Sequence, residues 1–251
     1  MPKNGRPEPG GTRAGPTRIR AADVLRPTFK RAFWHAYDHL GTLIVANLLW
    51  CVLCLGVVTA PPATAGLFSL ARRIAADEDA RLADFWVGFR RDLIPSIKLG
   101  AFTAGAAALL WFNIRFYGRL HGRAAFAGTA LATLLVWSAA FFALMHVHLH
   151  PLLSGGDRRL RTALRKSALL ALDNPGFTIV IALQSALLVA LLVASGVGLL
   201  LLAGSLTAVI LSTGHRELLK KYFPGSDAAS EAPETRSWRD LWRPWESQRP
   251  R

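Results

Sequence analysis

Three histidines at alternating positions have the residue type and spacing that suit metal or proton chemistry. They form the segment His146-Val-His148-Leu-His150, directly before Pro151. In a helix, His146 and His150 lie four residues apart on one face, as two ligands of one metal ion would. No Asp, Glu or Cys lies near them in the sequence to complete a closed site. Histidines at a membrane interface are therefore favoured over a metal or proton-sensing cluster, and His146 and His150 are weak candidates for metal ligands.

Two further groups of reactive side chains have a simpler structural interpretation. Cys51 and Cys54 stand three residues apart inside an apolar run, where thiols usually pack as small apolar groups; a redox or metal pair is the alternative. His35, Asp38 and His39 are typical of a solvated polar face. Since the sequence shows no paired carboxylates, metal quartet or Ser/His arrangement, we expect a protein that is not an enzyme and binds no cofactor.

Long apolar runs are the elements that must position these side chains. The chain has 251 residues, of which 52% are hydrophobic, and a formal net charge of +14, a combination typical of membrane proteins. Runs that approach or exceed the roughly 20 residues of a membrane-crossing helix lie near 41–58, 94–114, 124–145, 177–194 and 197–212. We predict an all-α polytopic bundle with about five full transmembrane helices.

The segment between the first two basic clusters decides the topology. Five crossings alone would leave large Lys/Arg clusters outside the cell, against the positive-inside bias of short loops. If 59–62 is a tight turn and 63–76 returns as a short or re-entrant helix, every large cluster becomes cytoplasmic. Pro61 and Pro62 suit the turn and the first helical turn, and Gly66 permits close packing on the first span. About 14 residues give roughly 21 Å, short of a hydrocarbon core of about 30 Å.

Polar residues are sparse within the predicted spans. All acidic side chains lie outside them, which disfavours ion-coupled transport because such transporters usually hold a carboxylate near the membrane midplane. A lone amide such as Asn47 more often bonds a neighbouring helix than a substrate. Arg115, Arg119 and Arg123 suit contact with anionic lipid or solute, although a solvated basic turn explains them equally well.

Basic and aromatic segments flank the predicted membrane domain, 22–222. Residues 1–21 are rich in Pro, Gly and Arg and are predicted to form a disordered basic arm near anionic headgroups. Residues 22–40 are amphipathic and predict an interfacial helix, with Pro27 breaking or starting it. Because the basic residues are spread over membrane-adjacent loops, nucleic-acid binding is not expected.

The tail, 223–251, carries a Trp-rich segment at 237–246. Within it, Trp238, Trp242 and Trp245 recur at helical spacing beside arginines, which suits the membrane interface. Docking to a partner protein is the alternative interpretation.

Several short motifs, which follow one another in a fixed order along the chain, resemble those of a known family. They are Asn47-Leu-Leu-Trp50, Thr59-Ala-Pro-Pro62, Asp84-Phe85-Trp-Val-Gly88-Phe89 and Asn174-Pro175. Over about 22–222 the chain resembles the YesL-like membrane proteins, a bacterial family called domain of unknown function 624. We assign structural roles to the motif residues Asn47, Trp50, Thr59, Pro61, Pro62, Thr64, Gly66, Asp84, Phe85, Gly88, Phe89, Asn174 and Pro175.

The resemblance implies an integral membrane protein without an established activity, whose genes often accompany carbohydrate uptake systems. We therefore expect a multi-pass protein of the cytoplasmic (inner) membrane, with both termini in the cytoplasm, that is accessory to an ABC-type sugar permease. The carbohydrate link comes from the resemblance alone. A small-solute transporter or channel without a membrane-embedded carboxylate is the alternative, and an intramembrane enzyme is less favoured. The expected partners are anionic lipid headgroups and that permease.

Overall fold

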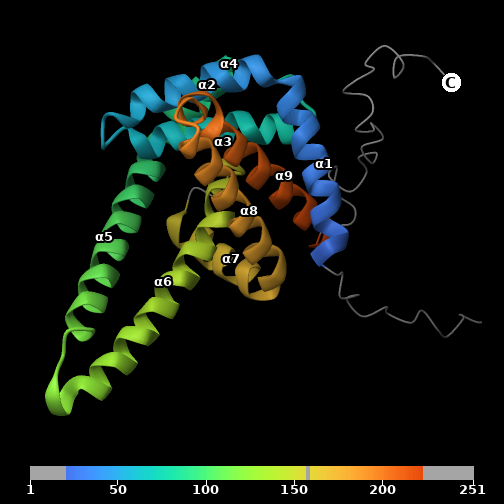
Figure 1. Cartoon of the computed structure of the whole chain (residues 1–251). Coiled ribbons are helices and arrows are strands. Elements are labelled where there is room, and N and C mark those ends of the chain that lie inside the picture. Colours follow the sequence, from blue (N-terminus) through green and yellow to red (C-terminus); the bar gives the residue numbers. More distant parts are fainter. Residues whose placement is uncertain (1–20, 157–158, 223–251) are drawn as a thin grey trace, which may run out of the picture.

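The structure is a computed structural model that describes residues 21–156 and 159–222 (Figure 1). All regular elements in these ranges are helical, which confirms the all-α class for this part of the chain. The α-helices are α1 Ala21–Asp38, α2 Leu40–Cys54, α3 Ala60–Ala75, α4 Leu82–Arg91, α5 Leu93–Tyr117, α6 Ala125–Ser154, α7 Leu160–Asp173, α8 Pro175–Ala194 and α9 Gly204–Tyr222. A 3₁₀ turn, η1 Gly122–Ala124, precedes α6, and a π-helical segment, η2 Leu199–Ala203, precedes α9. The predicted basic arm and the Trp-rich segment, with Trp238, Trp242 and Trp245, lie outside the described residues.

Three helices of the described part, α5, α6 and α8, are long and apolar enough to cross a membrane. They correspond to the predicted spans 94–114, 124–145 and 177–194. A fourth is reached only if α1 and α2, which meet at 86°, form one broken span. The expectation of five full spans is therefore wrong for the described residues. The predicted span 41–58 becomes the 15-residue helix α2, and 197–212 is divided between η2 and α9.

A threonine side chain adds polar contacts to the turn that follows α2. The Thr59 hydroxyl lies 2.5 Å from the carbonyl oxygen of Leu53 and 2.8 Å from that of Gly56. The regular helical hydrogen bonds stop in this stretch. Pro61 and Pro62 then occupy the first turn of α3, where a missing N–H costs no helical hydrogen bond.

α3 is the central helix of the fold, in the segment where the sequence predicted a short returning helix. Eleven of its 16 residues are buried, and it contacts α2, α4, α5, α6 and α9. Protein surrounds it on most sides. Its length therefore does not have to match the thickness of the hydrocarbon core.

α3 and α4 approach each other closely at two glycines. A Cβ on Gly88 would lie 2.3 Å from the Cβ of Ser69, and a Cβ on Gly66 would lie 2.7 Å from the carbonyl oxygen of Phe85. Neither distance is compatible with a side chain. The missing side chains let Phe85 become completely buried between the two helices.

α1 is part of the bundle, although the sequence predicted an interfacial helix. It continues through Pro27, contrary to the expectation that this proline would break or start it. Contacts with α8 and α9 hold it, including an ion pair of 2.9 Å between Arg31 and Glu217. These tertiary contacts offset the hydrogen bond that proline removes.

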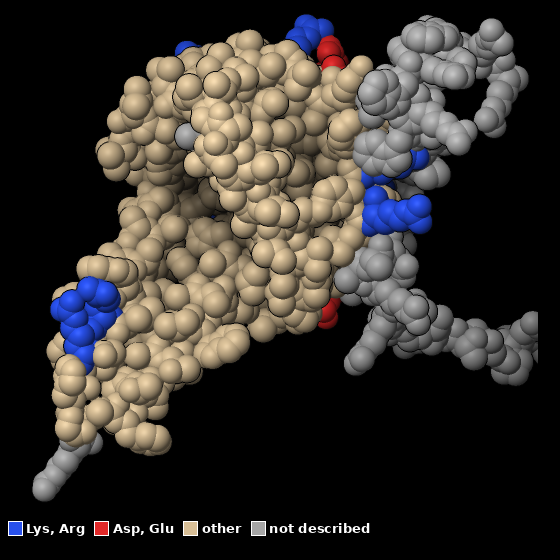
Figure 2. All heavy atoms as spheres, viewed as in Figure 1, with Lys and Arg blue, Asp and Glu red and all other residues tan. Residues whose placement is uncertain are grey.

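α5 and α6 form a long hairpin whose tip lies far from the other helices (Figure 1). Only 11% of the apolar window of each helix is buried. Large apolar side chains such as Leu109, Phe112, Phe126 and Trp137 are exposed on it. One face of the molecule is broad and mostly uncharged, with Lys and Arg atoms at its margins (Figure 2). Such a surface suits hydrocarbon surroundings.

The Gly88→Ala substitution tests the close contact between α3 and α4. We expect it to lower the thermal unfolding midpoint of the detergent-solubilised protein, because overpacking typically costs about 1–3 kcal/mol. Gly105→Ala in α5 is the matched control, since a Cβ there meets no atom within 4 Å; it should leave the midpoint unchanged or slightly higher. Equal midpoints for the two variants would contradict the contact.

Candidate functional site

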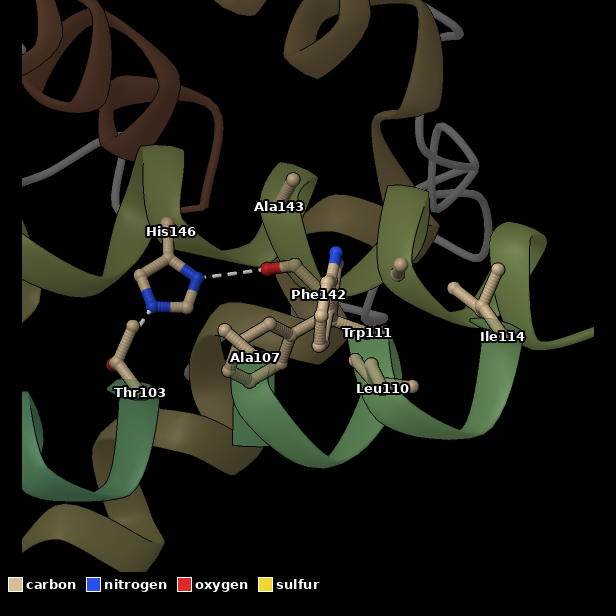
Figure 3. Close-up of a pocket in the computed structure, with 9 residues that line it drawn as sticks. Thr103, Ala107, Leu110, Trp111, Ile114, Phe142, Ala143 and His146 are labelled. Carbon is tan, nitrogen blue, oxygen red and sulfur yellow. Dashed lines mark hydrogen bonds between the residues drawn. The ribbon is translucent and has the colours of Figure 1, made fainter. Parts of the chain in front are cut away.

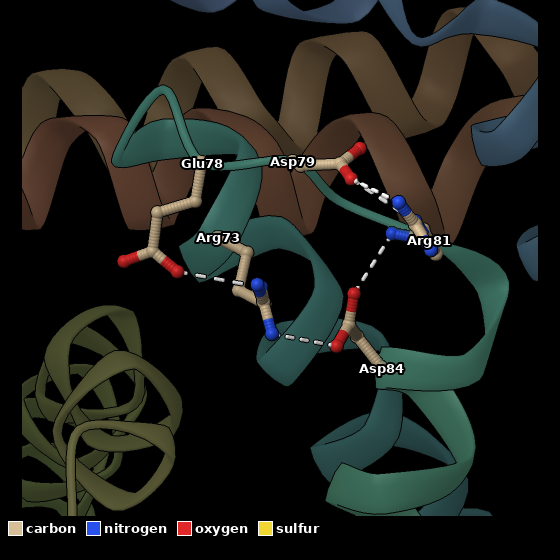
Figure 4. A network of polar contacts seen from close by, with 5 residues as sticks. All are labelled: Arg73, Glu78, Asp79, Arg81 and Asp84. Carbon is tan, nitrogen blue, oxygen red and sulfur yellow. Dashed lines mark hydrogen bonds and ion pairs between the residues drawn. The ribbon is translucent and has the colours of Figure 1, made fainter.

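Asp84 anchors a polar network where α3 leads into α4 (Figure 4). Arg73 Nη1 donates to Asp84 Oδ1 at 2.8 Å, and its Nε lies 3.3 Å from Glu78 Oε2. The backbone N–H of Arg81 donates to Asp84 Oδ2 at 2.8 Å, while its guanidinium pairs with Asp79 at 2.6 Å. One carboxylate thus caps the start of α4 and joins it to the end of α3.

Arg91 joins the end of α4 to the end of α6. Its Nε lies 3.0 Å from both carboxylate oxygens of Asp92, and its Nη2 donates to the carbonyl oxygen of Ser154 at 3.3 Å. The side-chain hydrogen bond to Asp92, which is 3% exposed, raises the pKa of the Arg91 guanidinium. The Arg91 guanidinium therefore keeps its positive charge at every physiological pH.

Further polar contacts join α9 to α1 and to the junction of α7 and α8. Asn174 Nδ2 donates to Tyr222 Oη at 2.6 Å, which ties the junction of α7 and α8 to the end of α9. Arg31 and Glu217, 7% and 11% exposed, join α1 to α9. A buried pair of this kind is costly to break from one side only.

His35 makes the last of these contacts between helices. Its Nδ1 lies 3.4 Å from Asp77 Oδ1, which joins α1 to the segment after α3. We call the contacts Arg73–Asp84, Arg91–Ser154, Asn174–Tyr222, Arg31–Glu217 and His35–Asp77 the polar ring. His35 was predicted to belong to a solvated polar face, but it is buried because α1 packs into the bundle.

Basic residues accompany these contacts on segments that are far apart in the sequence: Arg72, Arg73, Arg81, Arg90, Arg91, Arg161, Arg165, Lys166, Arg216 and Lys220. The tip of the α5–α6 hairpin holds Arg115 and Arg119, and the side chain of Arg123 lies outside the described residues.

Asn47 bonds the π-helical segment that lies within the predicted span 197–212. It is completely buried in α2; its Nδ2 donates to the carbonyl oxygen of Leu200 at 2.7 Å, and its Oδ1 accepts from the backbone N–H of Ser205 at 2.9 Å. Leu200 lies within η2 and Ser205 just after it, where the widened turn frees backbone groups. The amide satisfies them inside the protein.

The other motif residues also make contacts between helices or at helix ends. Trp50 Nε1 donates to Thr64 Oγ1 at 3.1 Å, which joins α2 to α3. Phe89 lies beside Gly66 on the α3–α4 contact. Pro175 occupies the first turn of α8 and follows Asn174 at the N-cap position.

Sequence reasoning missed one residue of this set, Gly100 in α5. A Cβ there would lie 2.4 Å from the Cγ of Pro61. Gly100 therefore lets the start of α3 rest against α5. The only signal in the sequence is a glycine inside an apolar run, which does not reveal its partner.

The histidines of α6 point in different directions. His146 Nδ1 lies 2.8 Å from the carbonyl oxygen of Phe142, and Nε2 lies 3.0 Å from Thr103 Oγ1 (Figure 3). His150 stacks on Phe68 of α3, with ring centroids 5.0 Å apart, and His148 Nε2 bonds Thr178 Oγ1 at 2.9 Å. In the described ranges no three His, Cys, Asp or Glu residues come together in a way that would hold a metal ion. His146 and His150 are instead engaged with protein groups.

A groove of about 520 Å³ lies between α5 and α6 (Figure 3). The pair Thr103–His146 lies at one end of it, and Ile114 at the other. Its remaining lining is apolar and consists of Ala107, Leu110, Trp111, Ala139, Phe142 and Ala143. A second hollow of about 590 Å³ shares Thr103, Ala107 and His146 and extends to Pro61 at the start of α3.

Cys51 and Cys54 are free thiols in α2. Cys51 Sγ accepts a weak hydrogen bond of 3.7 Å from Asn47 Nδ2. This contact belongs to the helix packing around Asn47.

Its three long apolar helices place this chain in the class of helical membrane proteins. The family described as "Protein of unknown function, DUF624" matches residues 43–114, from α2 into α5. The uncharacterized protein YesL of Bacillus subtilis (strain 168) is 27% identical over 175 residues, which cover 68% of this chain and 81% of that protein. No solved structure matches significantly. The two matches confirm the resemblance to the YesL-like DUF624 family.

Asp84→Ala tests the anchor of the polar network. The variant loses the cap of α4 and the ion pair to Arg73, and we expect it to lower the free energy of unfolding by about 1–2 kcal/mol. Asp79→Ala is the control, because the Asp79 side chain is 73% exposed and should change the unfolding free energy by less than about 0.5 kcal/mol. Thermal unfolding in detergent measures both, and a similar loss in the control would refute the assignment.

Proposed function

We propose that this chain is a non-catalytic, multi-pass protein of the cytoplasmic membrane that serves as an accessory subunit of an ABC-type carbohydrate uptake system. The carrying observation is the α5–α6 hairpin, which stands away from the other helices and leaves most of both spans unburied. Such a hairpin offers its sides to lipid and to the helices of another membrane protein. The carbohydrate part of the proposal rests on the family resemblance alone.

A stripe of small residues on α5 supports a helical partner. Ala101, Ala104, Gly105 and Ala108 recur at the spacing of one helix face and are exposed. In lipid, helices associate through close van der Waals packing, and small residues permit the backbones to approach. A partner helix would therefore pack on this stripe.

The polar ring supports the orientation that we propose. Short basic loops remain on the cytoplasmic side of a membrane, so the basic segments around α4 and α7 are proposed to face the cytoplasm. The described chain begins in α1 and ends in α9, and both helices take part in the polar ring. Both termini are accordingly proposed to be cytoplasmic.

Cysteine labelling tests the orientation. In a background with Cys51→Ala and Cys54→Ala, we expect an impermeant maleimide to label His121→Cys on intact spheroplasts, because His121 lies exposed at the hairpin tip. Asp79→Cys should be labelled only after the membrane is permeabilised. Labelling of the Asp79→Cys variant on intact spheroplasts would reverse or refute the proposed topology.

Affinity purification from mild detergent tests the accessory role. We expect a sugar permease subunit to be recovered with the full-length protein, and Ala108→Trp to lower its recovery about tenfold by overpacking the stripe. Ala107→Trp, one position away and directed into the groove, should leave the recovery unchanged. Recovery of no permease would contradict the role, and sugar flux into liposomes that contain only this protein would establish a transporter instead.

A further inference from the structure

The groove between α5 and α6 has the length of one membrane leaflet. Its lining on α5 runs from Thr103 to Ile114, eleven residues apart, or about 17 Å at the helical rise. Half of a hydrocarbon core of about 30 Å is about 15 Å. An extended chain lying in the groove would therefore cross one leaflet.

The position of the groove along α5 agrees with this length. Thr103 follows the first residue of α5, Leu93, by ten residues, or about 15 Å, which places it near the midplane of a bilayer that α5 crosses. Arg115 follows Leu93 by about 33 Å and so reaches the opposite headgroup level. The groove thus extends from the midplane to the headgroups at the hairpin tip.

The lining is suited to an apolar occupant. The two polar side chains at the deep end, Thr103 and His146, bond each other, and the second His146 nitrogen bonds Phe142 (Figure 3). They have no need of a ligand as a partner. A polar solute would lose its hydration there without replacement hydrogen bonds, whereas a hydrocarbon chain would lose nothing.

The shallow end combines an aromatic ring with positive charge. Trp111 lines the groove, and the Arg115 guanidinium lies 5.9 Å from the centroid of its ring. Arg119 is exposed in the turn two residues after the end of α5, and basic atoms gather near the hairpin tip (Figure 2). Tryptophan prefers the headgroup level, and arginine binds phosphate oxygens in a fork geometry.

We propose that this groove binds one anionic glycerophospholipid of the surrounding bilayer. One acyl chain lies between α5 and α6, with its end near Thr103 and His146, and the phosphate lies against Arg115 and Arg119. A helix of the same length, about 10–12 Å wide, has a volume of more than about 1,300 Å³, whereas the groove holds about 520 Å³. A partner helix would not fit inside it, and the stripe of small residues lies on another face of α5.

A photoreactive lipid tests the site. The full-length protein is placed in nanodiscs of phosphatidylcholine that contain phosphatidylglycerol with a diazirine at the end of one acyl chain. After irradiation, we expect mass spectrometry to find the label on peptides around Thr103 and Phe142. Ala107→Trp should abolish this label by filling the groove, while the matched control Ala108→Trp should retain it.

The headgroup contact is tested by the Arg115→Gln variant. We expect its preference for phosphatidylglycerol over phosphatidylcholine, measured by competition for the label, to fall about fivefold, the factor for one basic group near an anionic surface. Undiminished labelling of Ala107→Trp, or an unchanged preference in Arg115→Gln, would overturn the proposal. So would a permease helix that cross-links to Ala107→Cys. Because the partner test depends on Ala108 and the lipid test on Ala107, one proposal can fail while the other stands.

Discussion

The rest of the structure depends on the close approach of α3 and α4 at Gly66 and Gly88. A side chain at either position would overlap the opposite helix. Their absence lets the two backbones touch and lets Phe85 fill the core between them. α3 can then lie enclosed among α2, α5, α6 and α9. In lipid, where apolar side chains gain little from burial among helices, such close packing is a principal source of association energy.

Irregular backbone inside the bundle is possible because protein groups satisfy it. The turn between α2 and α3 uses the Thr59 hydroxyl, and the π-helical segment before α9 uses the Asn47 amide. Non-helical backbone at membrane depth is tolerated only where it is buried in protein or lines a cavity. In the polar ring, carboxylate and carbonyl groups likewise bind the arginine side chains.

The α5–α6 hairpin obeys a different constraint from the rest of the fold. Its helices also contact α3 and α7, but most of their apolar surface stays unburied, so lipid or another protein must cover the remaining faces. This leaves the hairpin two separate surfaces, an apolar groove that ends at Arg115 and a stripe of small residues around Gly105. The packed core of the fold thus positions an exposed pair of candidate spans. This arrangement suits a protein that binds lipid or other proteins in the membrane.

The sequence by itself determined the helical class, the family resemblance, and the candidate spans α5, α6 and α8, because a membrane-crossing helix needs length and apolar composition, which are local properties. It also indicated a short helix after the first apolar run through the charge of the flanking loops, although the turn, predicted at 59–62, lies before Ala60 and α3 begins at that residue. Only the tertiary structure decided the helix lengths, and with them the number of candidate spans among the described residues. Hydropathy does not distinguish a helix surrounded by lipid from one surrounded by protein, since both environments are apolar. The π-helical segment within 197–212 is bonded by Asn47, about 150 residues away, and the groove, the polar ring and the contact of Gly100 with Pro61 likewise exist only when distant segments meet.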